Sequence, residues 1–243
     1  MKFLTKFTNH SAYEAAESGL FLPNVSLCVN EDEVHYNPTT QQHDYVEIGG
    51  IKWATMNVGA NSITDNGLYF QWGDTQGYTY EQVGSDEGQK YFGWADYKFN
   101  PSGDGESFTK YNSADGKIVL DLEDDAANAA WGGDWRMPTT DEFQTLATAT
   151  TSAYTSNYEE SGVAGLVLIS NADSSKRLFF PSVGGVIEGR LLGPTRYGAS
   201  YWTSSLNSSE ISTSHLFGFK ASTVVWETMS SRDFGCVIRG VMD

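Results

Sequence analysis

The chain has 243 residues, of which 40% are hydrophobic and 14% aromatic, so it can supply the core of one large domain. Fifteen Lys and Arg residues against 31 Asp and Glu residues give a formal net charge of -16, which repels nucleic acid and anionic lipid surfaces. We therefore expect no nucleic-acid partner. We also expect no membrane insertion, because no apolar run approaches the roughly 20 residues of a spanning helix.

Residues 1–44 are predicted to form an N-terminal arm that ends in a polar linker. Good helix formers predict a short helix over residues 11–18. Two strands are predicted at residues 24–28 and 33–36, around a polar turn at residues 29–32. A two-stranded ribbon of this size is not stable alone, so we expect it to attach to the main domain or to another subunit.

The first residues and the two cysteines bear on export and redox chemistry. Thr5 and Lys6 interrupt the hydrophobic core that an export signal needs, so classical secretion is not expected. Cys28 and Cys236 cannot form a disulfide framework or a four-ligand zinc site. We expect two free, buried thiols; the alternative is a single bridge from the arm to the last strand.

Residues 45–243 are predicted to form one α+β domain that opens with a hairpin over residues 45–55. Gly49 and Gly50 suit a two-residue turn. Such a turn predicts three cross-strand pairs and one apolar face: Ile48 with Ile51, Val46 with Trp53, and Glu47 with Lys52.

Two helical segments are predicted in the middle of the chain. Thr139 is the expected N-cap of the longer one, with Glu142 completing a capping box and Phe143 and Leu146 facing the core. A shorter turn is expected over residues 122–130, where Asp121, Asp124 and Asp125 are interpreted as charges at the helix start.

The rest of the domain is predicted to consist of an irregular insertion and short strands. Residues 60–121 are rich in turns and aromatic side chains and are expected to be ordered without regular elements. Trp53, Trp131, Trp135 and Trp202 are expected in the core. Strands are predicted at residues 165–169, 177–181, 201–204, 215–220, 224–227 and 236–241.

Six sequence blocks occur in a characteristic order. They are IKWATMNVGA (51–60), GLYFQWGD (67–74), LEDDAANAAWGGDWRMPTTDEF (122–143), LFFPSVGG (178–185), YWTSS (201–205) and FGCVIRGV (234–241). In these blocks the chain resembles the Fibrobacter succinogenes major paralogous domain. The resemblance implies a C-type-lectin-like fold with a small twisted antiparallel sheet, one or two helices and long irregular loops. It also implies kinship with formylglycine-generating enzymes and with the variable proteins of diversity-generating retroelements.

The arm carries a second resemblance. Its sequence FTNHSAYEAAESGLFLPNVSLCVNEDEVHYNP is similar to segments that precede C-terminal modules in structural proteins of Bacteroides phages. This resemblance implies a protein of the virion, assembled in the host cytoplasm, whose arm binds other virion proteins or forms a homo-oligomer. The alternative location is the bacterial cell surface.

Catalytic and metal-binding chemistry finds little support in the sequence. The related formylglycine-generating enzymes use redox-active cysteine, whereas Cys236 lies in a strand pattern without a second cysteine nearby, so we expect no enzyme activity. His10, His35, His43 and His215 lack metal-ligand spacing.

Carbohydrate-binding lectins of the fold that the resemblance implies often hold sugar hydroxyls through calcium. The Glu-Pro-Asn, Gln-Pro-Asp and Trp-Asn-Asp triplets of calcium-dependent lectins do not occur in the chain. Asn100, Ser102, Asp104 and Glu106 alternate oxygen ligands in a loop, a pattern that a hard cation can use. A solvated acidic turn is the preferred interpretation, so no cofactor is expected.

The expected binding face is the C-terminal segment, which carries the variable residues in the retroelement-diversified relatives. Its small polar and aromatic residues are typical of protein surfaces that bind varied ligands. The predicted contacts are Tyr197, Asn207, Glu210, His215, Lys220, Trp226 and Arg232. They predict a virion-associated binding module for a host-surface glycan or protein; the alternatives are a structural decoration protein without a ligand, a cell-surface adhesin or a formylglycine-generating-type enzyme.

Overall fold

The computed structural model describes residues 29–30, 33–34, 43–193, 198–221 and 223–242. The chain divides into two units, Met1–Gln42 and His43–Asp243.

In the first unit, β1 (Val29–Asn30) pairs antiparallel with β2 (Glu33–Val34). The first strand therefore occupies positions that the sequence predicted as turn. The predicted helix at 11–18 and the predicted strand at 24–28 lie outside the described residues.

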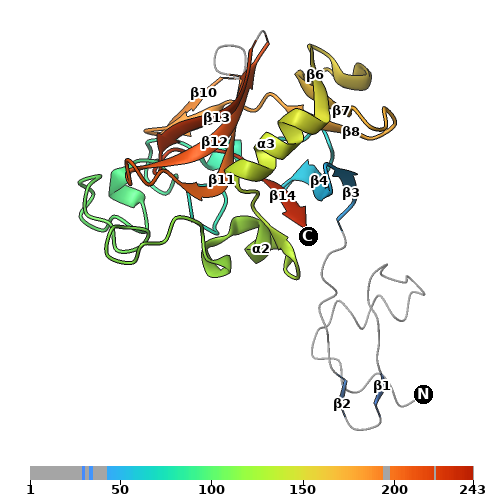
Figure 1. The fold of residues 1–243 in the computed structure, drawn as a ribbon. Coiled ribbons are helices and arrows are strands. Elements are labelled where there is room, and N and C mark those ends of the chain that lie inside the picture. Colours follow the sequence, from blue (N-terminus) through green and yellow to red (C-terminus); the bar gives the residue numbers. More distant parts are fainter. Residues whose placement is uncertain (1–28, 31–32, 35–42, 194–197, 222, 243) are drawn as a thin grey trace, which may run out of the picture. The chain divides into compact units, whose positions relative to one another are not determined.

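The second unit begins with the predicted hairpin (Figure 1). Strands β3 (Tyr45–Ile48) and β4 (Ile51–Asn57) are joined by Gly49 and Gly50, whose φ angles of 65° and 78° suit a tight hairpin turn. The three predicted cross-strand pairs are confirmed. The sheet continues as β3-β4-β14-β5, where β14 is Arg239–Met242 and β5 is Trp135–Arg136. The last strand of the chain thus lies directly beside one of the first.

Capping residues position both described α-helices. The predicted capping box of α3 (Thr140–Ala149) is confirmed: the Thr139 hydroxyl accepts from the Glu142 amide, and the Glu142 carboxylate accepts from the Thr139 amide. Residues 122–130 form two pieces instead of one, a 3-10 turn η4 (Leu122–Asp124) and then α2 (Ala126–Trp131). Asp125 ends the turn and caps α2, because its side chain accepts from the amides of Ala127 and Asn128.

The remaining strands form two three-stranded sheets and one small hairpin. One sheet has the order β6-β7-β8, another β11-β12-β13, and β9 pairs with β10. Their bounds are β6 Thr150–Thr155, β7 Gly165–Ser170, β8 Arg177–Pro181, β9 Gly185–Ile187, β10 Arg190–Leu192, β11 Ala199–Leu206, β12 Thr213–Lys220 and β13 Thr223–Ser231. Strands β5, β6, β9 and β10 were not predicted, and the predicted strand at 236–241 begins only at Arg239.

Two clusters of buried side chains form the core. The first lies around Trp53, Phe143, Phe180 and Phe217, between α3 and the sheets. The second lies around Trp72 and includes many aromatic residues of the insertion at 60–121. That insertion is ordered as predicted and contains only two 3-10 turns, η2 (Tyr80–Gln82) and η3 (Trp94–Asp96); another, η5, is Tyr158–Glu160. The four tryptophans predicted in the core are buried.

All pairings between the described strands are antiparallel. With α2 and α3 as the α-helices of the described residues, this part of the chain is an α+β domain dominated by antiparallel sheet. None of the helices in the described ranges is long and apolar enough to cross a membrane.

Candidate functional site

Strands β12 and β13 form a long hairpin at the C-terminal face that the sequence singled out. Leu216 pairs with Thr228 and Gly218 with Val225, so β13 carries one extra residue between these pairs. A bulge of this kind turns two consecutive side chains toward the same side of a sheet. Trp226 and Glu227 occupy the bulge, and both lie on the side of the sheet that faces α3.

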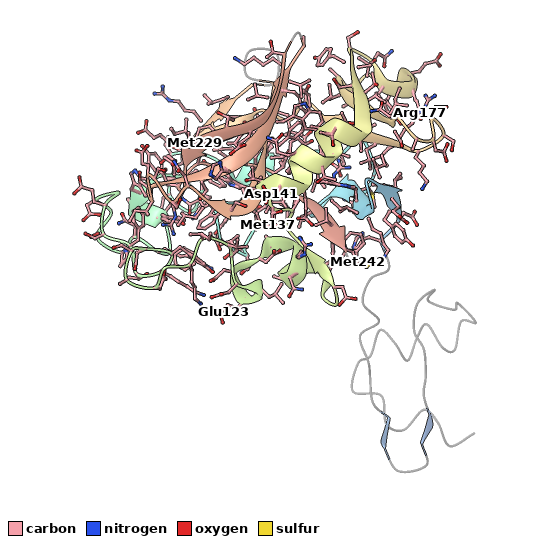
Figure 2. The ribbon with its side chains drawn as sticks, in the orientation of Figure 1. Glu123, Met137, Asp141, Arg177, Met229 and Met242 are labelled. Atoms are coloured by element: carbon pink, nitrogen blue, oxygen red, sulfur yellow. The ribbon has the colours of Figure 1, made fainter. Side chains whose placement is uncertain are left out.

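On that side, four side chains from three elements gather into what we call the β13 patch: Gln144, His215, Glu227 and Met229. The carboxylate of Glu227 lies 3.2 Å from Nδ1 of His215 and accepts a hydrogen bond of 3.3 Å from Nε2 of Gln144. Met229 pairs with His215 across the strands and is 53% exposed (Figure 2). The patch therefore combines one apolar side chain with groups that donate and accept hydrogen bonds.

Aromatic packing underneath holds the β13 patch rigid. The ring of Phe143, from α3, stacks on Phe217 with centroids 4.9 Å apart and an interplanar angle of 15°. Trp226 also packs against Phe217, with ring centroids 5.0 Å apart. Trp226 is thus half-buried against the first core cluster, and only part of its ring is available as the contact surface that the sequence predicted.

The other predicted contacts are spread along the hairpin. Glu210 is exposed in the turn before β12, where its amide donates to the Asn207 carbonyl at 3.2 Å. Lys220 is exposed at the opposite end of β12 from His215, about 17 Å away at the usual rise per strand residue. Tyr197 lies outside the described residues. The structure therefore brings His215 and the Asn207–Glu210 turn to one end and leaves Lys220 at the other.

Asn207 is a correction to the predicted surface. Its side chain is 7% exposed, and its amide nitrogen donates to the Thr213 hydroxyl at 3.0 Å and to the Met229 sulfur. Its carbonyl oxygen accepts from the amide of Ser209 at 3.1 Å. Asn207 is thus a buried residue that holds the turn and contacts the Met229 side chain, and not the exposed residue that the sequence predicted.

Arg232 is the clearest correction, because it is fully buried although the sequence placed it on the binding face. Its guanidinium donates to the Tyr97 hydroxyl at 2.8 Å and to the carbonyls of Lys110, Tyr111 and Ile211. The same group lies over several rings of the insertion, with Phe108 nearest at 4.4 Å. These four hydrogen bonds within the protein explain why a charged residue is stable there, and they make Arg232 a structural residue.

The loop at residues 100–106, whose spacing of oxygen ligands a calcium ion could use, forms hydrogen bonds within itself. Asn100 donates to Asp104 at 2.8 Å, and the same carboxylate accepts from the amides of Glu106 and Ser107. These hydrogen bonds, with that from Asn100 first, hold the pKa of Asp104 far below its usual range. The side-chain oxygens of Asp104 and Asn100 are therefore engaged in fixing the turn.

A second acidic group, Asp121, Glu123 and Asp124, has ligand atoms within 4.8 Å of one another and could hold a metal ion by spacing alone. The ammonium of Lys110 lies among them, at 2.7 Å from Asp121, 2.6 Å from Glu123 and 2.5 Å from Asp124. Lys98 also binds Asp124 at 2.8 Å. A lysine thus occupies the position that a cation would take.

Cys236 bears on the alternative of an oxidase. It is a free thiol, fully buried in the second core cluster, where its backbone bridges to Phe70. Burial raises the pKa of this thiol well above its usual value, so it is protonated at neutral pH. A thiolate nucleophile would need an exposed position with a lowered pKa, and Cys236 has neither.

Some features of the site were not predicted. Glu227 and Met229 lie within the C-terminal segment that the sequence indicated as the binding face. Strict alternation along β13 would put them on the opposite side of the sheet from Trp226. The bulge breaks this alternation and brings all three side chains to the same side. Gln144 lies on α3, far away in the sequence, and no local signal connects it to β13.

Comparison of the chain with family models, with curated proteins and with solved structures finds no match.

Proposed function

We propose that this protein is a non-enzymatic binding module of a virion that recognises a host-surface glycan or protein through the β13 patch. The observation that carries this proposal is the exposure of Met229 on β13 beside His215, which lies next to the Glu227 carboxylate that Gln144 also contacts. Binding sites commonly join an exposed apolar contact to a few fixed polar groups, and rigid strands lower the entropy lost on binding.

The finer class, a C-type-lectin-like domain of the Fibrobacter succinogenes type, is part of the same proposal. Its support is the sequence blocks, which supply core residues such as Trp72, Trp131 and Trp202, together with the antiparallel α+β architecture. The virion location and the role of the N-terminal arm in attachment or oligomerisation rest on the resemblance of that arm to phage structural proteins.

The test is binding of the purified, fluorescently labelled full chain to intact cells of candidate Bacteroides hosts. The double variant Glu227→Ala and Met229→Ser removes the centre of the β13 patch, and we expect it to lose at least about tenfold in affinity, the usual effect of removing central contacts. Arg232 is not a useful variant, since its loss would disturb the fold.

Val225→Ser is the matched control, because Val225 is 40% exposed on the same strand but pairs with Gly218 and faces away from α3. We expect this variant to bind like the parent chain. Equal binding by the parent chain and the double variant would exclude the patch. Absence of binding by every form would favour a structural decoration protein.

A further inference from the structure

A hollow at another place on the domain lies between η2 and the β9–β10 hairpin. Its volume is about 280 Å³, and it is lined by Tyr80, Glu81, Val83, Gly189 and Leu191. Pockets for small molecules usually measure roughly 300–1,000 Å³, so this one accommodates about a single ring. None of its residues belongs to the β13 patch.

The close fit of the hairpin tip against the insertion forms the hollow. The amide of Gly189 donates to the Tyr91 carbonyl at 2.5 Å, and the amide of Glu188 donates to the Phe92 carbonyl at 3.0 Å. Gly189 has a φ of 69°, and a Cβ atom there would lie 2.8 Å from the backbone of Gly84. Because Gly189 has no Cβ atom, the tip of the β9–β10 hairpin can approach the backbone of Gly84 closely at the edge of the hollow.

The floor and the rim differ in chemistry. Val83 and Leu191 are half-buried and pack on the first core cluster, so they form a fixed aliphatic floor. Tyr80 stands on the rim with 53% of its surface exposed, so its ring is available to a ligand. Glu81 beside it is exposed, and the Thr79 hydroxyl donates to its carboxylate.

Two hydrogen bonds between Thr79 and Gln82 hold these rim residues in place. The Thr79 amide donates to the Gln82 side chain at 2.8 Å, and the Gln82 amide donates to the Thr79 carbonyl at 3.1 Å. These hydrogen bonds fix the backbone of the short turn that carries Tyr80 and Glu81, and so they fix the positions from which the two side chains extend over the hollow.

We infer that this hollow is a saccharide site that takes one pyranose ring. A pyranose has an apolar C–H face, which matches the Tyr80 ring and the aliphatic floor, and hydroxyl groups that donate to the Glu81 carboxylate. A lysine or arginine side chain of a protein is the competing ligand, through Glu81 and the Tyr80 ring. The apolar face of a pyranose is broad enough to cover the aliphatic floor and the Tyr80 ring together, which favours the sugar over the narrow stem of a lysine or arginine.

The inference depends on the proposed function in one respect only, namely that the sugar would come from the host surface. It is tested by NMR titration of the ¹⁵N-labelled full chain with the methyl pyranosides of glucose, galactose, mannose and N-acetylglucosamine. We expect at least one of them to shift the amides of Val83, Gly189 and Leu191, with a dissociation constant on the order of millimolar, as for other single-ring ligands. Nα-acetyl-lysine methylamide is titrated in parallel.

Tyr80→Ala and Glu81→Gln should each weaken pyranoside binding at least about tenfold, whereas Tyr45→Ala should leave it unchanged. Tyr45 is the matched control, since it is a comparably exposed tyrosine (45%) on β3 and does not line the hollow. The amide spectrum of each variant reports whether the fold is intact. Shifts by the lysine derivative alone, no shifts by any pyranoside, or equal affinity in Tyr80→Ala would each overturn the inference.

This experiment separates the two proposals. Cell binding without any pyranoside response would leave the β13 patch as the binding surface and remove the saccharide site. Pyranoside binding by a chain that does not bind host cells would keep the saccharide site and remove host recognition.

Discussion

The Oδ1 atom of Asn57 accepts two hydrogen bonds from the guanidinium of Arg239, at 3.0 Å from Nε and 2.8 Å from Nη2. The remaining donors of Arg239 reach the carbonyls of Ala54, Thr55 and Phe179 at 2.9–3.0 Å. One buried side chain therefore ties the last strand to β4 and to β8 without a carboxylate partner. Burial lowers the pKa of this guanidinium to about 10, which still leaves it charged at neutral pH.

Arg239→Met should destabilise the domain strongly, because it removes five largely buried hydrogen bonds, two to the Asn57 side chain and three to backbone carbonyls. Each unsatisfied buried group costs roughly 1–3 kcal/mol, so we expect the free energy of unfolding to fall by at least about 3 kcal/mol. Urea denaturation followed by tryptophan fluorescence measures the change.

Arg177→Met is the control for that substitution. Arg177 is exposed at the start of β8 and its Nε atom donates to the Ser174 carbonyl at 3.1 Å (Figure 2). Its loss should change the free energy of unfolding by no more than about 0.5 kcal/mol. Similar effects of the two substitutions would show that the buried network contributes little.

Local signals predicted the parts of this fold that depend on neighbours in sequence. Gly49-Gly50 fixed the register of the first hairpin, and Thr139 with Glu142 fixed the start of α3. Strand β6 was missed because TTSAYT is rich in small polar residues, carries no apolar alternation and follows α3 without a break. The pairings that close the domain, such as β4 with β14, join segments about 180 residues apart and have no local signal.

The capping box of α3 predicts a dependence of stability on acid. Burial raises the pKa of Glu142, but two hydrogen bonds from Arg136, at 2.7 and 2.8 Å, and one from the Thr139 amide outweigh it, so the pKa lies below its usual value. The ionised carboxylate is thus favoured in the folded state. Its contribution is complete above the unfolded pKa, roughly 4.3, and is lost as the pH falls through the folded pKa.

Glu142→Gln should lower the free energy of unfolding at neutral pH by about 1–2 kcal/mol, the scale of a lost cap with its ion pair. The difference between this variant and the parent chain should shrink as the pH falls from about 6 to about 3. Chemical denaturation at several pH values measures it. A difference that stays constant over this range would mean that Glu142 does not act through its charge.

The site was harder to predict than the fold, for two physical reasons. Arg232 follows a polar run and looks like a surface residue, but the rings that enclose it, such as Tyr97 and Phe108, lie in the insertion more than 100 positions earlier. The bulge at Trp226 and Glu227 changes which side chains face α3, and a bulge depends on the partner strand. Chain composition identified the hairpin as polar and aromatic but not which of its atoms face solvent.

Lys110 predicts how the acidic group at Asp121, Glu123 and Asp124 responds to divalent cations. Because the ammonium already binds all three carboxylates, adding calcium or removing it with EDTA should leave the melting temperature of the parent chain unchanged within about 1 °C. In Lys110→Ala the carboxylates repel one another, so calcium should raise the melting temperature. Differential scanning fluorimetry with and without calcium tests both statements. If calcium stabilised the parent chain, the ammonium of Lys110 would not be what occupies the space between the three carboxylates.

Buried tyrosines predict a loss of stability in alkali. Burial raises the pKa of Tyr201 to about 12, and burial also raises the pKa values of Tyr69, Tyr97 and Tyr111. An unfolded tyrosine releases its proton near pH 10, so above that pH the unfolded chain binds fewer protons than the folded one. The free energy of unfolding must then fall as the pH rises, by up to about 1.4 kcal/mol per pH unit for each such tyrosine.

Urea denaturation at about pH 9 and about pH 11 measures the slope, and absorbance at 295 nm follows tyrosine ionisation over the same range. Tyr201→Phe should show a shallower slope than the parent chain, since phenylalanine has no proton to release, although it loses the 2.9 Å hydrogen bond to the Pro181 carbonyl and is less stable at neutral pH. The ionisation of the buried tyrosines should coincide with unfolding. Full tyrosine ionisation in a chain that keeps its native fluorescence would show that these hydroxyls reach solvent without loss of the fold.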